Sequence, residues 1–123
     1  MKKSLAIIIP AFKKRFLRET LNSIASQTCK NFTVYIGDDY SPDNLEVIVD
    51  EFRNLIDLKY VRFKNNIGAK NLVKHWNRCL NLINDEEWVW LFSDDDLMEP
   101  NCVDLFYKEL ENETEKLIFR FDV

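Results

Sequence analysis

The sequence predicts a doubly wound α/β domain of three layers, with helices on both faces of a mostly parallel sheet of about five strands. Short apolar runs alternate four times with segments whose apolar residues recur at helical spacing. The runs are nearly continuous, which is typical of parallel strands covered on both faces. Because the 123 residues contain no linker or repeat, we expect a single domain over residues 1–123.

The strands are expected where the apolar runs occur, at residues 5–9, 33–36, 58–63, 88–92 and 117–121. Pro10 is expected to end the first strand, and Lys59 and Arg62 make the third strand the most polar. The fourth run continues directly into three carboxylates, Asp94 to Asp96.

The helices are expected between the strands, at about residues 17–25, 45–52, 69–83 and 103–110. Ser41 is expected to cap the second helix. The apolar stripe of the third helix includes Leu72, Val73 and Trp76. His75 is off that stripe, so we expect its side chain at the surface, without a catalytic partner.

Three charged loops follow strands directly, at residues 10–15, 38–40 and 93–96. The carboxyl ends of parallel strands meet at one edge, where ligands bind at the reversal of strand order, so these loops are expected to converge. The acidic loop 93–96 suits a divalent cation that bridges a phosphorylated ligand. Alternatively, it is an acidic loop ahead of a helix, where negative charge is favourable.

The chain has only two glycines, Gly37 and Gly68, and neither a phosphate-binding G-x-x-x-x-G-K-[ST] loop nor a G-x-G-x-x-G turn. A bound phosphate must therefore be met by a metal and by basic side chains, for which Lys13 to Arg15 are candidates. That basic run is alternatively a solvated face. Asp38 and Asp39 are able to accept hydrogen bonds from a ribose or a pyrimidine, or to form a turn before the next helix.

Composition excludes several classes. A net charge of −4 gives no electrostatic case for nucleic acid, and no apolar run approaches the roughly 18 residues of a membrane span. The three cysteines are far apart and suggest reduced thiols. We expect a cytoplasmic protein that meets the membrane face only through a longer parent chain. A response-regulator receiver is also a small α/β domain with an acidic pocket, but its paired acids follow the first strand. In this chain the acidic residues follow the second and fourth strands, which argues against that class.

Four segments carry a family resemblance in order and spacing: IIIPAFKKRFLRETLNSIASQT, NFTVYIGDDYSPDN, NNIGAKNLVKHWNRCLNL and EEWVWLFSDDDLMEP. Together they cover essentially residues 4 to 110, and the chain resembles the N-terminal, nucleotide-sugar-binding part of a family 2 glycosyltransferase of the GT-A fold. The family's Pro-x-Tyr-Asn loop reads Pro10-Ala11-Phe12-Lys13 here, and Tyr40 replaces a usual glycine. The family's Asp-x-Asp metal motif falls on Ser93-Asp94-Asp95.

The resemblance implies a set of nucleotide-binding residues: Pro10, Ala11, Phe12, Asp38, Asp39, Lys70 and Asp94. It implies that Asp39 contacts the base. It also implies a metal site in which Asp95 binds Mn²⁺ or Mg²⁺ on the diphosphate, with Asp94 and Asp96 beside it.

The implied reaction is metal-dependent transfer of a sugar, with inversion, from a nucleotide-diphosphate donor such as a UDP-sugar to an unknown glycan or lipid-linked acceptor. No catalytic base is expected within the chain, because the acceptor-binding half of the family lies beyond Val123. The chain is thus expected to be a fragment of a longer transferase that carries the donor site alone. The alternative is a non-catalytic nucleotide-sugar-binding or interaction module.

Overall fold

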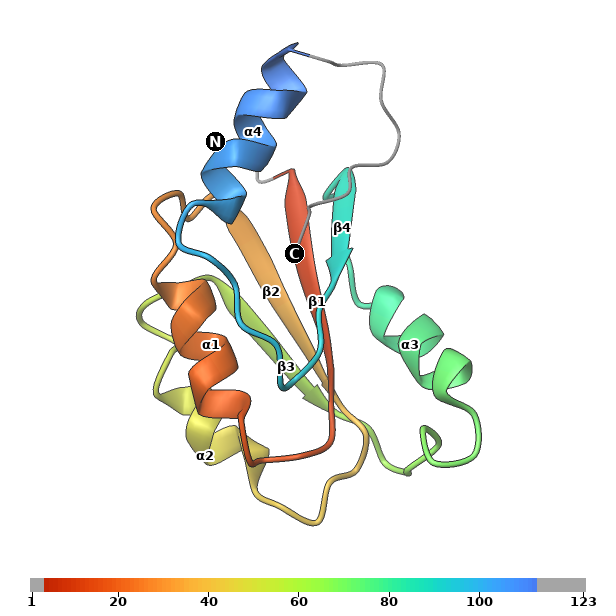
Figure 1. The fold of residues 1–123 in the computed structure, drawn as a ribbon. Coiled ribbons are helices and arrows are strands. Elements are labelled where there is room, and N and C mark those ends of the chain that lie inside the picture. The colour runs from red at the N-terminus through yellow and green to blue at the C-terminus, as the bar shows by residue number, and fades with distance from the viewer. Residues whose placement is uncertain (1–3, 113–123) are drawn as a thin grey trace.

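The computed structural model describes residues 4–112, and within that range strands and helices alternate in the expected order (Figure 1). The strands are β1 (Leu5–Ala11), β2 (Phe32–Asp38), β3 (Leu58–Arg62) and β4 (Trp88–Leu91). The helices are α1 (Leu17–Ala25), α2 (Leu45–Asp50), α3 (Leu72–Leu80) and α4 (Cys102–Asn112). The expected strand at 117–121 lies outside the described residues.

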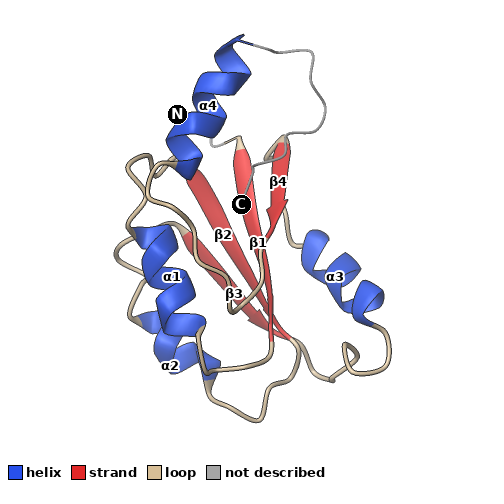
Figure 2. Cartoon of the chain, in the orientation of Figure 1, coloured by secondary structure: helices blue, strands red, loops and turns tan. Residues whose placement is uncertain are grey.

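The four described strands form one parallel sheet in the order β3-β2-β1-β4 (Figure 2). β2 pairs with β1, and β3 pairs with the other edge of β2. β4 pairs with the edge of β1 that β2 leaves open. Strand order therefore reverses between β1 and β4, and in open parallel sheets this junction is where a crevice for ligands forms.

β1 continues past its expected end and includes Pro10, which has no backbone N–H to donate. The Ile8 carbonyl accepts the Phe92 N–H at 2.8 Å on the β4 side, whereas the Ala11 carbonyl accepts the Asp39 N–H at 2.9 Å on the β2 side. Backbone groups of successive strand residues face alternate sides, so Pro10 faces the β4 side. β4 pairs with β1 only as far as Ile8, so the proline leaves no ladder hydrogen bond unmade.

Helices cover both faces of the sheet, which confirms the doubly wound, three-layer α/β class. α1, α2 and α4 lie on one face and α3 on the other (Figure 1). The larger core joins Ile7 and Ile9 to side chains of α1, α2 and α4. The smaller core contains Ile8, Tyr35 and the α3 residue Cys79. No helix among residues 4–112 is long and apolar enough to cross a bilayer.

β4 is less covered than its apolar sequence predicted. Trp88 and Trp90 pack on the larger core, with ring centroids 5.8 and 5.3 Å from that of Phe106. Val89 and Leu91 point to the other face and are 37% and 46% exposed. The nine-residue α3 packs against β1 and β2 instead. The expectation of a strand covered on both faces is thus confirmed for β1 and wrong for β4.

α3 turns a different face to the sheet than its apolar periodicity predicted. His75 and Cys79 are 2% and 0% exposed, whereas Leu72 and Val73 are 50% and 60% exposed. The expectation that His75 lies at the surface is therefore wrong. This face of α3 also carries Arg78, which donates to the carboxylate of Asp39 directly after β2 at 2.6 Å. A buried charge must be compensated by nearby polar groups, and the requirement favours this face over the apolar stripe.

Candidate functional site

A pocket of about 530 Å³ opens beyond the carboxyl ends of β1 and β4, where the strand order reverses. Its walls come from segments far apart in the sequence: residues 10–13, Asp39, parts of residues 66–76 and residues 91–96. The predicted convergence of the three loops at one edge is thereby confirmed. The volume falls within the range of roughly 300–1,000 Å³ that is usual for small-molecule sites.

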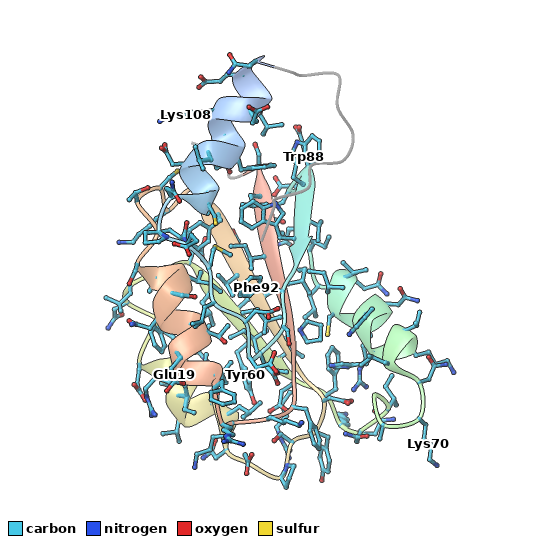
Figure 3. The ribbon with its side chains drawn as sticks, viewed as in Figure 1. Glu19, Tyr60, Lys70, Trp88, Phe92 and Lys108 are labelled. Carbon is cyan, nitrogen blue, oxygen red and sulfur yellow. The ribbon has the colours of Figure 1, made fainter. Side chains whose placement is uncertain are left out.

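Most of the predicted site residues line this pocket, namely Pro10, Ala11, Phe12, Asp39, Asp94, Asp95 and Asp96. Two are placed elsewhere. Asp38 is fully buried behind the pocket wall. Lys70 is exposed on the loop that leads into α3, at the outer side of that loop (Figure 3).

Asp94 joins the loop after β4 to the loop after β1. Its Oδ2 accepts the backbone N–H groups of Phe12 and Lys13 at 2.9 and 3.0 Å. Hydrogen bonds to a charged acceptor are among the stronger ones in proteins, so this contact holds the first loop in place. The predicted role of Asp94 towards a ribose or a metal stays a prediction, for which Oδ1 is the remaining oxygen.

Asp95 and Asp96 are exposed at the rim of the pocket. Asp95 Oδ1 accepts the Ser93 hydroxyl at 2.6 Å, while Asp94 turns towards the first loop. The consecutive carboxylates therefore diverge, and within residues 4–112 no three His, Cys, Asp or Glu side chains are grouped so that they hold a metal by themselves. A Mg²⁺ or Mn²⁺ ion here fits only if ligand phosphates and water complete its shell, which is common for Mg²⁺.

Asp39 organises the opposite wall of the pocket. Its Oδ1 accepts the Ile67 N–H at 2.9 Å and an Arg78 Nη2–H at 2.6 Å. Its Oδ2 accepts the Gly68 N–H at 2.9 Å and the Asn66 amide at 3.2 Å. Two donors on each oxygen satisfy the carboxylate, whose side chain is only 5% exposed. The loop at residues 66–68 is thus folded around Asp39 before any ligand arrives.

Arg78 completes this arrangement from the last turn of α3. Its guanidinium lies 4.0 Å from the centroid of the Phe63 ring, and its Nη2 also donates to the Asn65 carbonyl at 2.9 Å. Its Nε donates to Nδ1 of His75 at 3.0 Å. Nδ1 is therefore an acceptor, which assigns His75 as a neutral ring with its proton on Nε2.

Burial is the main cause that lowers the pKa of His75; the Asp39 charge opposes this shift and the Arg78 charge adds to it. The Cys79 Sγ lies 3.7 Å from His75 Nε2, but burial raises the pKa of this thiol to about 12. Cys79 and His75 are therefore a neutral buried pair and not a thiolate nucleophile with its base.

Asp38 supports the same edge from the interior. Its Oδ1 accepts the Ser41 N–H at 2.9 Å and its Oδ2 accepts the Tyr60 hydroxyl at 2.5 Å. Burial and this bond raise the pKa of Tyr60, so the phenol stays a donor. Because Asp38 is 0% exposed, its predicted contact with a ribose or base stays a prediction that requires the loop to open.

Ser41 and Tyr40 shape the turn after β2. The expectation that Ser41 caps the second helix is wrong, because the N-cap of α2 is Asn44. The Ser41 hydroxyl instead donates to the Phe12 carbonyl at 2.5 Å and so ties the second loop to the first. Tyr40 has φ of 55°, a left-handed conformation that favours glycine, and Arg62 stacks 4.2 Å from its ring centroid.

The residues around Asp39 were missed by sequence reasoning. His75, Arg78 and Cys79 are spaced i, i+3 and i+4, which places them on one face of a helix. That spacing was the available signal, but it does not identify Asp39, 39 residues away in the sequence, as the carboxylate that accepts a hydrogen bond from Arg78. For Asn66 and Gly68 the signal was a glycine that follows a strand. A Cβ at Gly68 would lie 2.3 Å from Asp39 Oδ2, so this close approach requires glycine.

A parallel sheet with a pocket at its strand reversal and an acidic loop at the rim defines an open, doubly wound α/β domain, a class in which ligands bind at this position. The particular family follows from comparison with known sequences. The family model described as Glycosyl transferase family 2 matches residues 6–121. The chain belongs to glycosyl transferase family 2, as its four motifs predicted, and its fold is the GT-A fold.

This chain spans less than two fifths of the length of the relatives compared below. It is 40% identical over 63 residues to chondroitin synthase of Escherichia coli, a match of 50% of this chain and 9% of that protein. It is 32% identical over 107 residues to an uncharacterized glycosyltransferase of Haemophilus influenzae, a match of 85% and 38%. The solved structure of Staphylococcus aureus TarS 1–349 in complex with UDP is similar with a TM-score of 0.81 and 26% identity, over 90% of this chain and 33% of that one.

Proposed function

We propose that this chain is the donor-binding part of a glycosyltransferase that transfers a sugar from a nucleotide-diphosphate donor, a UDP-sugar, to a glycan or lipid-linked acceptor. The observation that carries the proposal is that one pocket is lined by both Asp39 and the acidic loop at residues 93–96. Structures of TarS 1–349 in complex with UDP and with UDP-GlcNAc, both 26% identical to this chain, support the choice of donor.

We place the nucleobase between Phe12 and the wall built around Asp39. Phe12 lines the pocket and is 38% exposed, so its ring face is available for a planar base. Asn66 and Gly68 form the opposite side of the slot, and the hydrogen bonds from the loop to Asp39 hold them in position. In this arrangement the base enters a preformed slot, which lowers the ordering cost of binding.

The diphosphate then lies against the loop at residues 93–96, where a divalent cation is required because carboxylates and phosphates repel each other. Asp95 would hold Mn²⁺ or Mg²⁺, with Asp94 Oδ1 and Asp96 close to its waters. When bound, the ion stabilises the negative charge that develops on the departing nucleoside diphosphate. An inverting displacement also needs a general base for the acceptor hydroxyl, and we assign that role to no residue among 4–112.

Isothermal titration calorimetry of the chain with UDP, with and without Mn²⁺, tests the proposal. We expect UDP to bind in the presence of Mn²⁺, and Asp95→Ala to weaken that binding by at least about tenfold, because it removes a direct ligand. Asp104→Ala on α4 is the matched control, since it removes one carboxylate that does not line the pocket and whose partner is the exposed Lys108.

Two results would contradict the donor site: no binding of UDP to the wild-type chain, or UDP binding that is equally strong in Asp95→Ala. Because the chain is proposed to carry the donor site without a general base, a transfer assay on the whole transferase separates an enzyme from a non-catalytic nucleotide-sugar-binding module. UDP binding by the whole protein without transfer would favour the module.

A further inference from the structure

Tyr60 lies on β3, which β2 separates from β1 and the pocket, and its ring packs against the larger core (Figure 3). It does not line the pocket. Its hydroxyl donates to Asp38 Oδ2 at 2.5 Å, and burial raises the pKa of this phenol, so it remains a donor. Because Asp38 is 0% exposed and water does not reach its carboxylate, this hydrogen bond fixes the orientation of the Asp38 side chain.

The other oxygen of Asp38 holds the turn after β2. Asp38 Oδ1 accepts the Ser41 N–H at 2.9 Å, and Arg62 Nη2 donates to the Ser41 carbonyl at 3.2 Å. Both backbone groups of Ser41 are therefore bonded to side chains of the sheet, one on β2 and one on β3. Ser41 is 1% exposed, so its hydroxyl must also find its partners inside the protein.

The Ser41 hydroxyl connects this turn to the loop after β1. It donates to the Phe12 carbonyl at 2.5 Å and accepts the Asp43 N–H at 3.1 Å. The N–H of the same peptide group, which belongs to Lys13, donates to Asp94 Oδ2 at 3.0 Å. One peptide group is thus held at both of its polar atoms, by the turn after β2 at its oxygen and by the acidic loop after β4 at its nitrogen. It cannot rotate without breaking one of these hydrogen bonds.

We propose that Tyr60 is a positioning residue for the nucleotide and that it acts through Asp38 and Ser41. Their hydrogen bonds fix the peptide group that places the Phe12 ring against the base. A ring whose backbone is fixed before binding loses less free energy when the ligand arrives. This inference rests on the proposed function, in which Phe12 supplies an aromatic face for the base. It also gives Asp38 a role that requires no opening of the loop.

Tyr35 provides the matched control within the same sheet. It lies on β2 and is 1% exposed, and its hydroxyl donates to a carboxylate oxygen, Glu86 Oε1, at 2.7 Å. Glu86 directly precedes β4, so this bond lies at the amino edge of the sheet, opposite the pocket. Tyr35→Phe therefore removes the same atom and the same kind of hydrogen bond as Tyr60→Phe, but leaves the pocket edge intact.

Calorimetry with UDP and Mn²⁺ on the full chain tests the proposal. We expect Tyr60→Phe to weaken UDP binding about fivefold, because one hydrogen bond to a buried carboxylate is lost, and Tyr35→Phe to leave the affinity unchanged. Ser41→Ala should also weaken binding. Adding Tyr60→Phe to Ser41→Ala should then cause little further loss, because both residues act on the same peptide group. A purely structural role of Tyr60 would instead give losses that add up.

Amide hydrogen exchange measured by NMR on the same proteins gives a readout that needs no nucleotide. The Lys13 amide should exchange about fivefold faster in Tyr60→Phe than in the wild-type chain, because the loop opens more often, and at the wild-type rate in Tyr35→Phe.

The proposal is overturned if Tyr60→Phe binds UDP as tightly as the wild-type chain, if Tyr35→Phe loses as much affinity, or if the losses of Tyr60→Phe and Ser41→Ala add up. An unchanged exchange rate at Lys13 in Tyr60→Phe also overturns it. Absent UDP binding in the wild-type chain counts against the donor site itself, whereas faster exchange at Lys13 in Tyr60→Phe still supports Tyr60 as the residue that holds this loop.

Discussion

Replacing Arg78 with methionine is expected to destabilise the domain strongly, because it leaves Asp39 as a buried carboxylate without its cation. Methionine keeps much of the stem that packs on Phe63 and removes the guanidinium. The lost contacts are those of Nη2 with Asp39 and the Asn65 carbonyl, of Nη1 with Asn65 Oδ1, and of Nε with His75. The substitution therefore tests charge compensation more than packing volume.

The magnitude follows from burial. Removing one partner of a buried ion pair costs about 3–5 kcal/mol. The Asp39 side chain is 5% exposed but that of Arg78 is 19% exposed, so we expect the lower end of that range, about 3 kcal/mol. Domains of this size unfold with a total free energy of roughly 5–15 kcal/mol, so the melting temperature should fall by about 10 °C.

Urea denaturation followed by circular dichroism gives the free energy of unfolding for each variant. Arg18→Met is the matched control. Arg18 bonds Glu51 with two nitrogens, but the side chains are 55% and 44% exposed, so solvent screens this ion pair and its loss should be much smaller than that of the buried pair. Asp39→Asn/Arg78→Met should lose less than the two single losses added together, because a neutral amide needs no cation. The reasoning is refuted if Arg78→Met costs no more than Arg18→Met.

Three further predictions concern the same edge. Gly37→Ala should lower the free energy of unfolding, measured by thermal unfolding, by about 1–3 kcal/mol, because the new Cβ would lie 2.3 Å from Cys79 Sγ. Most of that loss should disappear when Cys79 is also replaced by alanine. An equal loss in the Cys79→Ala background would contradict the steric reason. Gly68→Ala would place a Cβ 2.3 Å from Asp39 Oδ2 and should weaken UDP binding in calorimetry at least about tenfold, so unchanged affinity would exclude this wall from the nucleotide site. The folded state lowers the pKa of His75 below its ordinary value of 6.5, so the unfolded chain takes up the proton first and stability should fall as the pH drops below about 6.5. His75→Asn, which keeps an acceptor for the neighbouring guanidinium, should flatten this part of the pH–stability profile, and an unchanged slope would assign the effect to other groups.

Local patterns were sufficient to predict the sheet and the edge of the sheet where the pocket lies. Apolar runs such as the one that includes Ile7 and Ile9 predict strands buried on both faces, and alternation with helices predicts parallel pairing. Polar residues directly after the strands then predict loops at one edge. Sequence patterns did not predict the hydrogen-bond partner of Ser41. Its expected role as a helix cap assumed that its hydroxyl would bond to a backbone N–H of the helix that follows it. Its hydroxyl instead bonds to the Phe12 carbonyl in another loop.

The class of fold, the family and the position of the acidic loop could be inferred from sequence, because these depend on periodicity and on residue types at short spacing. The folded structure was needed to show that His75 is buried and that Asp39 is satisfied by Arg78 and the loop at 66–68. It also decided that Asp94 holds the first loop through two backbone N–H groups. The physical reason is that a buried carboxylate must find several donors at once, and these donors come from segments that are neighbours only after the chain has folded.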